Sequence, residues 1–192
     1  MALSSRPKLY CATGNTHKFA LGKIAFDKQG IDLEQVFIDI DEIQGEDAEV
    51  ILADKARKAF ESLGVPVLVS DDSWSIPALK GFPGAYMKSI NHWFEPLDFL
   101  NLMTGKEDRT IYLDQYLAYI DGNEIMTFTK RLRGVIVDSP KGDTGPPIMR
   151  IVELEDDGMT IAEAYDAGLA NRKGAERDAW KDAAVWYSSH LD

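Results

Sequence analysis

The chain has 192 residues, a length that suits one domain with a substantial core or two closely joined lobes. Acidic residues outnumber basic ones by 32 to 21, which argues against a protein that coats nucleic acid, because phosphate backbones attract basic surfaces. The single cysteine, Cys11, rules out an internal disulfide and fits a reducing compartment. Without a signal peptide or a membrane-length apolar segment, the sequence predicts a cytoplasmic protein with no membrane partner.

The first half of the chain alternates predicted strands with predicted helices. Apolar runs predict strands over residues 7–13, 36–41 and 65–73. Apolar residues at helical spacing predict helices over residues 17–30 and 47–63. Gly30 and Gly64 suit the ends of these helices, and Cys11 is expected in the core of the first strand.

The second half contains a predicted hairpin between helical segments. Helices are expected over residues 92–103 and over most of 160–190. Two long strands are predicted over 110–121 and 124–137, joined by a turn at "DGN". Gly/Pro-rich loops are expected at "ALKGFPGAY" and "SPKGDTGPP". Alternating strands and helices followed by a hairpin indicate an α/β fold with a mixed sheet, as a single domain over residues 1–192.

The stretch "ATGNTHK", residues 12–18, links the first predicted strand to the first helix. Thr13 and Asn15 suit a helix start because their side chains accept hydrogen bonds from free N–H groups, and Gly14 permits a sharp turn. The same N–H groups attract anions, and Lys18 adds positive charge one turn into the helix. The stretch is typical of a capped helix start and equally of a phosphate-binding loop.

Acidic residues and a further lysine follow later in the chain. Glu42 precedes the second helix, Lys55 lies on it, and Asp71 and Asp72 end the buried strand. Mg²⁺ takes one or two carboxylates and completes its shell with water and phosphate oxygens, while lysines balance phosphate charge, so the set suggests a magnesium–phosphate site. The alternative is a solvated lysine and an acidic helix start. Neighbouring strand residues face opposite sides, so the pattern alone does not choose between Asp71 and Asp72.

Taken in order, these motifs resemble the inosine triphosphate pyrophosphatase family, enzymes for non-canonical purine nucleoside triphosphates. Its opening T-G-N-x-x-K is matched by Thr13, Gly14, Asn15 and Lys18. An acidic residue before Q-G-E and a helix lysine follow in the family, and "DEIQGED" offers Glu42 and "ADKARKAF" offers Lys55. The family loop A-L-x-G-x-P-G-x-Y is matched throughout by "ALKGFPGAY". The ordered set, rather than any single motif, carries the resemblance over nearly the whole chain.

The resemblance implies an elongated mixed sheet flanked by helices, with two lobes, a nucleotide-binding cleft between them and a homodimer. It also implies that water attacks the α-phosphorus of a nucleoside triphosphate and releases the monophosphate and pyrophosphate, with Mg²⁺ as cofactor. In this chain Thr13, Gly14 and Asn15 would hold phosphate oxygens. Lys18 and Lys55 would balance the triphosphate charge.

The remaining site residues also follow from the resemblance. Glu42 and Asp71 would hold Mg²⁺, Asp71 would orient or deprotonate the water, and Lys88 would reach a phosphate. Aligned without a gap from "ALKGFPGAY", the catalytic aspartate falls on Asp71, and Ser70 stands where members usually have an acid. A one-residue gap would instead bring Asp72 into play as a metal ligand. We favour Asp71 because the loop match is long.

Two segments depart from the family pattern. Members usually carry an aromatic-Asp-Pro segment after the hairpin, where this chain has Gly145-Pro146. Members usually have Ser-His-Arg before the last helix, where this chain has "ANR" with Arg172, and a lysine six positions earlier is Asp166. In the family these elements surround the base, so the resemblance supports the triphosphate site more than inosine specificity. Arg172 would contact the base or be a solvated arginine.

Two other hypotheses compete with this one. "VFIDIDEI" offers Asp39 and Asp41 as the D-x-D of an aspartyl-phosphate phosphatase, but that motif is not in the first strand. The altered base segment and Ser70 suggest a catalytically reduced nucleotide-binding module on the same fold. The related septum-formation-inhibitor-like pyrophosphatases share the chemistry, but the "ALKGFPGAY" loop points away from them.

Overall fold

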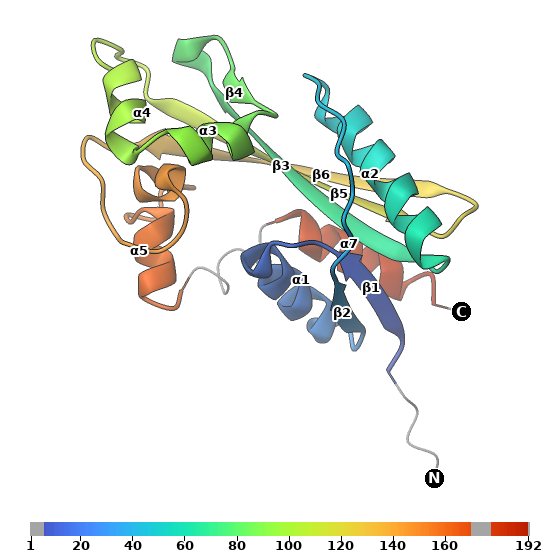
Figure 1. Cartoon of the computed structure of the whole chain (residues 1–192). Helices are drawn as coiled ribbons and strands as arrows, with labels where there is room; N and C mark the ends of the chain where they lie inside the picture. The colour runs from blue at the N-terminus through green and yellow to red at the C-terminus, as the bar shows by residue number, and fades with distance from the viewer. Residues whose placement is uncertain (1–5, 170–177, 192) are drawn as a thin grey trace. The chain divides into compact units, whose positions relative to one another are not determined.

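A computed structural model describes residues 6–169 and 178–191 (Figure 1). Within these residues seven strands form one mixed sheet in the order β2-β1-β3-β5-β6-β7, and β4 pairs with β3. The described residues form two compact units, the first with residues 6–71, 116–130 and 178–191 and the second with 72–115 and 131–169. The predicted mixed α/β fold is confirmed.

The elements of the first unit are β1 (Lys8–Ala12), α1 (Thr16–Lys28), β2 (Asp32–Val36), α2 (Ala48–Leu63) and α7 (Ala179–Ser188). Three strands contribute residues to both units: β3 (Val67–Ile76), β5 (Thr110–Ile120) and β6 (Ile125–Ile136). The second unit holds β4 (Phe82–Gly84), α3 (Met87–Trp93), α4 (Pro96–Leu102), β7 (Val152–Leu154) and α5 (Ile161–Asp166), with 3-10 turns at Pro77–Leu79 and Pro147–Arg150.

In the first unit the sheet is covered on both faces, with α1 and α7 on one side and α2 on the other (Figure 1). β1 pairs in parallel with β2 and with β3. Successive strand residues point to opposite faces, so Cys11 packs in the cluster that contains α1 and α7, while Ala12 packs in the cluster that contains α2. Doubly covered parallel strands are apolar throughout, which is why "VLV" at 67–69 was recognisable as a central strand.

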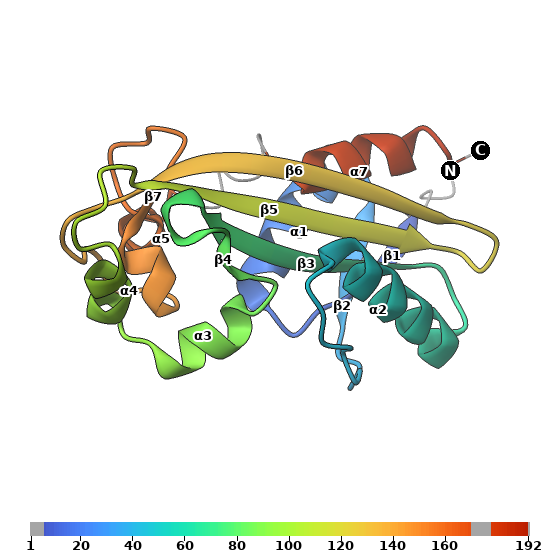
Figure 2. The same cartoon turned by 90° about the horizontal axis from the view of Figure 1, so that it is seen from above.

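The second unit has its own apolar core. Trp74, Ile76, Phe99, Ile111 and Ile136 belong to one buried cluster there. The long strands β5 and β6 run side by side in Figure 2. Their turn forms as predicted, since Asp121 accepts hydrogen bonds from the N–H groups of Asn123 and Glu124.

The predicted strand over 36–41 is wrong. β2 ends at Val36, and residues 37–47, called here the acidic strap, contain no helix or strand. Ile38 and Ile40 pack against the apolar cluster around α2, which explains the alternating pattern without any sheet pairing. The actual strand "DLEQV" was missed because only Leu33 in it is buried.

The predicted helix over 92–103 is two helices, α3 and α4. Pro96 begins α4 at a position where its missing N–H costs nothing, and the carboxylate of Asp98 accepts a hydrogen bond from the backbone N–H of Glu95. α3 begins earlier than predicted, at Met87. The short strand β7 was also missed, because three residues are too few to show a period.

Candidate active site

The junction of β1 and α1 is built by Thr13 and Asn15. Thr13 is 8% exposed, its N–H donates to Val36 O, and its carbonyl accepts from the Gln35 side chain at 2.8 Å. Its Oγ1 accepts from the N–H of Asn15 at 3.1 Å. Asn15 caps α1, since Oδ1 accepts from the N–H groups of His17 at 3.0 Å and Lys18 at 3.1 Å. The predicted helix cap is therefore confirmed, and the role of the same segment in binding phosphate, which the cap would serve, stays a prediction.

Gly14 is not required by the fold at this junction. Its φ lies outside the left-handed region, and a Cβ atom built on it would meet no atom within 4 Å. The chain does bend at Gly14, as predicted, but the bend does not need the conformational freedom of glycine. Open space next to a helix start leaves room for a group from outside the chain to approach the backbone.

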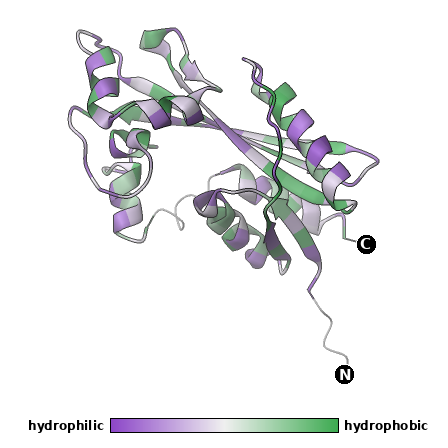
Figure 3. Ribbon diagram, viewed as in Figure 1, coloured by the Kyte–Doolittle hydropathy of each residue, from purple (hydrophilic) through white to green (hydrophobic). Residues whose placement is uncertain are grey.

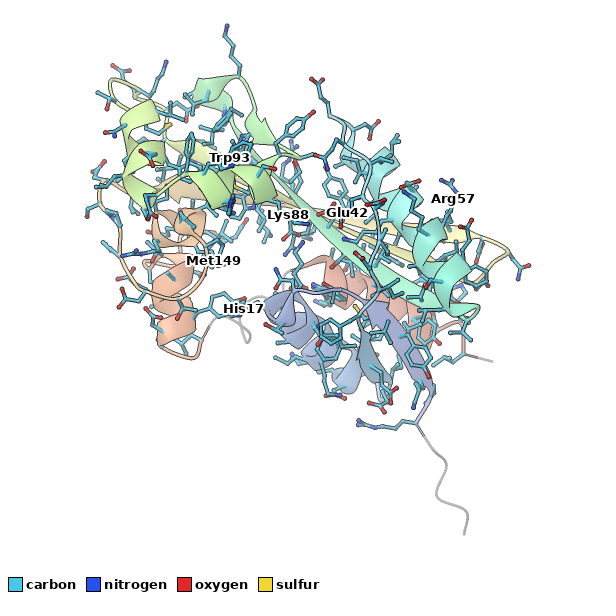
Figure 4. All side chains as sticks on the ribbon, in the orientation of Figure 1. His17, Glu42, Arg57, Lys88, Trp93 and Met149 are labelled. Carbon is cyan, nitrogen blue, oxygen red and sulfur yellow. The ribbon has the colours of Figure 1, made fainter. Side chains whose placement is uncertain are left out.

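Lys55 joins two segments that are distant in sequence. Its Nζ lies 2.9 Å from Glu42 Oε1 on the acidic strap and donates to the Ser70 carbonyl in β3 at 3.1 Å. The Lys55 side chain is only 14% exposed and that of Glu42 28%. Figure 4 shows Glu42 on the strap beside α2. The contacts place a lysine and a carboxylate immediately before Asp71 in β3.

Two predicted lysines lie near the end of β1. Burial raises the pKa of the Cys11 thiol to about 12, and the positive charges of Lys55 and Lys18 oppose that rise. Lys18 comes from α1 and Lys55 from α2, so both helices bring positive charge to this strand end. Cys11 is fully buried, in agreement with its predicted core role.

The alternation of β3 separates Asp71 from its neighbours. Val67 and Val69 pack with α2, whereas Leu68 packs with α1 and α7. Continuing the alternation puts Asp71 on the α2 side, the side of Lys55, and puts Ser70 and Asp72 on the opposite face. Ser70 is 3% exposed, and its Oγ has no hydrogen-bond partner among the described residues. An acid at position 70 would thus face away from Lys55.

The other predicted site residues lie elsewhere. Asp72 and Lys88 belong to the second unit, where Lys88 is in the first turn of α3 and is exposed (Figure 4). Arg172 lies outside the described residues. Across residues 6–169 and 178–191, no group of three or more His, Cys, Asp or Glu side chains is placed to hold a metal ion. Glu42 and Asp71 therefore remain a two-carboxylate hypothesis.

Sequence reasoning missed Lys58 on α2. Its Nζ donates to the Asp41 carbonyl at 2.6 Å and pairs with Asp54 Oδ2 at 2.8 Å. The signal was available, because Asp54 and Lys58 are four residues apart and so share a helix face. Figure 3 shows hydrophilic and hydrophobic residues alternating along α2, as expected for a helix with one solvent-facing side.

The β6–β7 loop (residues 137–151), where the sequence departs from the family, is fastened to α5 in the second unit. Asp166 accepts hydrogen bonds from the N–H groups of Asp143, at 2.8 Å, and Thr144, and from the Thr144 hydroxyl. These bonds, that of the Thr144 hydroxyl above all, lower the pKa of Asp166. Thr160 Oγ1 donates to the Lys141 carbonyl at 3.0 Å. Asp166, one of the departing residues, thus binds the two loop residues directly before Gly145-Pro146.

The geometry is that of a mixed α/β protein in which Lys55 joins Glu42 to β3 immediately before Asp71. Asp71 and Asp72 lie within β3 rather than at its end, where the sequence had predicted them, because the strand continues to Ile76. The chain belongs to the Ham1 family, whose sequence profile matches residues 9–169. This confirms the resemblance predicted from the ordered motifs. Across the described residues, no helix is long and apolar enough to cross a membrane.

Relatives and solved structures agree with this assignment. The chain is 36% identical to a dITP/XTP pyrophosphatase of Methanopyrus kandleri over 81% of this chain and 84% of that protein. It is 33% identical to an inosine triphosphate pyrophosphatase of Tuber melanosporum over 95% of this chain and 97% of that protein. A HAM1 protein from Coxiella burnetii has the same fold, with a TM-score of 0.76 and 19% identity over 95% of this chain and 99% of that one.

Proposed function

We propose that this protein hydrolyses a non-canonical purine nucleoside triphosphate, of the inosine, xanthosine or deoxy type, to the monophosphate and pyrophosphate. The observation that carries the proposal is the placement of Lys55, whose Nζ joins Glu42 to the Ser70 carbonyl immediately before Asp71. The names of the relatives, dITP/XTP pyrophosphatase and inosine triphosphate pyrophosphatase, support the same substrate class. The whole chain, residues 1–192, would act as one such domain.

The chemistry needs charge balance and an oriented water. Thr13, Gly14 and Asn15 would hold phosphate oxygens at the start of α1, where Gly14 leaves space for them. Lys18 and Lys55 would balance the triphosphate charge. Asp71 would orient or deprotonate the water that attacks the α-phosphorus, and pyrophosphate would leave.

The residues present fit Mg²⁺. Glu42 and Asp71 supply two carboxylates, the number that Mg²⁺ commonly takes from protein while it keeps waters and phosphate oxygens. Asp72 would be a ligand only if the one-residue gap in the alignment is real, because it faces away from Asp71 along β3. Bound Mg²⁺ would withdraw charge from the triphosphate oxygens.

Lys88 and Arg172 complete the predicted substrate contacts. Lys88 would reach a phosphate and Arg172 the base, both by resemblance. A homodimer is proposed on the same basis, whereas a cytoplasmic location is proposed because the single cysteine fits a reducing compartment. Light scattering after size-exclusion chromatography measures the first, and a species of monomer mass would contradict it.

The deciding experiment measures pyrophosphate release with Mg²⁺ across inosine, xanthosine and the four common nucleoside triphosphates and their deoxy forms. Selective release from inosine and xanthosine substrates supports the proposal as stated. Release from another base instead means that the chemistry is kept and the base preference has changed. Tight binding without release favours the catalytically reduced binding module, and a trapped covalent phosphoenzyme favours the aspartyl-phosphate alternative at Asp39 or Asp41.

A further inference from the structure

Helix α2 holds the acidic strap at two adjacent residues. Lys55 Nζ pairs with the carboxylate of Glu42, and Lys58 Nζ donates to the backbone carbonyl of Asp41. Lys55 and Lys58 are three residues apart, so they project from the same side of the helix. One lysine therefore holds the side chain of Glu42, and the other holds the peptide group directly before it.

Besides these two contacts, the strap is anchored by Ile38 and Ile40, which pack against the apolar cluster around α2, and by Asp47, which caps α2. Residues 37–47 contain no helix or strand, and the strap runs up beside α2 in Figure 1. Five of its eleven residues are acidic: Asp39, Asp41, Glu42, Glu46 and Asp47. These negative charges repel one another. The positive charge of Lys58 reduces that repulsion, and its hydrogen bond to the Asp41 carbonyl also holds the strap backbone.

Lys58 is itself oriented by a partner. Asp54 Oδ2 lies 2.8 Å from Lys58 Nζ, one turn earlier on α2. The side chains of Lys58 and Asp54 are 35% and 29% exposed, so this pair is partly shielded from water. Arg57 offers the contrast, because it is exposed and makes no ion pair or side-chain hydrogen bond with any described residue (Figure 4).

We propose that Lys58 is a positioning residue, which fixes the Asp41 peptide and thereby keeps Glu42 at Lys55 on the α2 side of β3. The relation of Lys58 to the strap rests on the contacts alone. Its consequence for catalysis rests on the function proposed above, in which Glu42 is a metal ligand. Lys58 does not touch the reacting groups in this scheme.

The first test measures the strap directly. Hydrogen exchange of the peptide covering residues 37–47 is followed by mass spectrometry in Lys58→Met, in Lys58→Arg and in Arg57→Met, which removes the same charge from the neighbouring position. We expect exchange of the strap to rise about three- to tenfold in Lys58→Met, the range for a lost hydrogen bond to a partly exposed charged group. Lys58→Arg should restore most protection, and Arg57→Met should match the wild type. Equal exchange in Lys58→Met and Arg57→Met would overturn the proposal.

The second test measures the consequence for the site. Mn²⁺ binding, followed by electron paramagnetic resonance with a non-hydrolysable inosine triphosphate analogue, should weaken about three- to tenfold in Lys58→Met and stay unchanged in Arg57→Met. Asp54→Asn should give a smaller loss, because Lys58 keeps its donor but loses its orienting carboxylate. Faster strap exchange with unchanged Mn²⁺ binding would remove the link between Lys58 and Glu42. Absence of pyrophosphate release in the wild type would count against the proposed function, while hydrogen exchange still decides the role of Lys58.

Discussion

The β1–α1 junction and the β6–β7 loop are both irregular segments next to a helix, but they use their polar groups differently. At the junction, Thr13 and Asn15 organise the backbone, and Gly14 faces open space. In the β6–β7 loop, Asp166 binds three donors of residues 143 and 144, and Gly142 is packed against α5. The segment that follows the family motif therefore has open space at Gly14, whereas the loop that departs from the motif is hydrogen-bonded to α5 and packed against it.

The largest effect should come from Asp71. Asp71→Asn removes the proposed base while keeping the size of the side chain, so we expect pyrophosphate release to fall by about 10²-fold or more. Thermal unfolding should change little, because Asp71 is only partly buried. Pyrophosphate release and melting temperature are measured on the same samples. Full activity in Asp71→Asn together with loss in Asp72→Asn would show that the alignment is wrong by one residue.

A stability loss should follow from adding a side chain at Gly142, where the loop already packs closely against α5. This residue has φ of +75°, and a Cβ atom would lie 2.5 Å from Glu163 N and 2.7 Å from the Ala162 carbonyl carbon. Backbone cannot give way as a flexible side chain does, so Gly142→Ala should lower the free energy of unfolding by about 2–4 kcal/mol. Urea titration measures the loss.

Gly158→Ala provides the matched control for this change. Gly158 has φ of +73°, yet a Cβ atom there would meet nothing within 4 Å. Only the backbone strain then remains, and we expect a loss of about 1 kcal/mol. Equal losses of unfolding free energy in the two variants would mean that close packing of the loop against α5 does not contribute to stability.

Gly14→Ala at the β1–α1 junction should have the opposite pattern, with little change in stability and a loss of activity. No atom lies within 4 Å of the added Cβ, so the free energy of unfolding should change by no more than about 0.5 kcal/mol. Activity should fall about tenfold through a higher KM, because the methyl group fills space meant for a phosphate oxygen. Urea titration and initial rates separate the two effects. An unchanged KM would place the phosphate elsewhere.

The smallest expected effect is the pH dependence of stability that comes from Asp166 and the β6–β7 loop. The hydrogen bonds from Thr144 and Asp143 hold the pKa of Asp166 below its ordinary value of about 3.9. A lowered folded-state pKa gives stability that is complete above the unfolded-state pKa and is lost as pH falls through the folded-state pKa. The wild type should therefore have a higher melting temperature than Asp166→Asn at pH 7, and the difference in melting temperature should shrink toward pH 3. A difference that stays constant from pH 7 to pH 3 would contradict this.

Much of the fold was predictable where burial imposes a clear period. The helix over 47–63 and the hairpin strands were recognised because each buries one face or is flanked by turn residues. The sequence placed a strand at residues 36–41 rather than at β2, and this error could not be avoided from the sequence. Ile38 and Ile40 alternate like a strand because they pack against one cluster, whereas β2 is an edge strand with a polar sequence.

Part of the candidate site was likewise predictable from the sequence and part was not. The sequence by itself determined the ordered motif set, and with it the family, because each motif is a local run of residue types. It also determined the Asn15 cap, because the N–H groups that donate to the Asn15 side chain lie only two and three residues further along the chain.

Only the tertiary structure decided which groups meet. Glu42, Lys55 and the Ser70 carbonyl come from three elements, and their contacts depend on how α2 and the strap pack against β3. The contact of Lys58 with Asp41 joins residues 17 positions apart through a backbone carbonyl, a group that every residue carries and no sequence pattern marks. Chain-distant contacts of this kind are fixed by packing, which is why the sequence named Glu42 but not the residue that holds it in place.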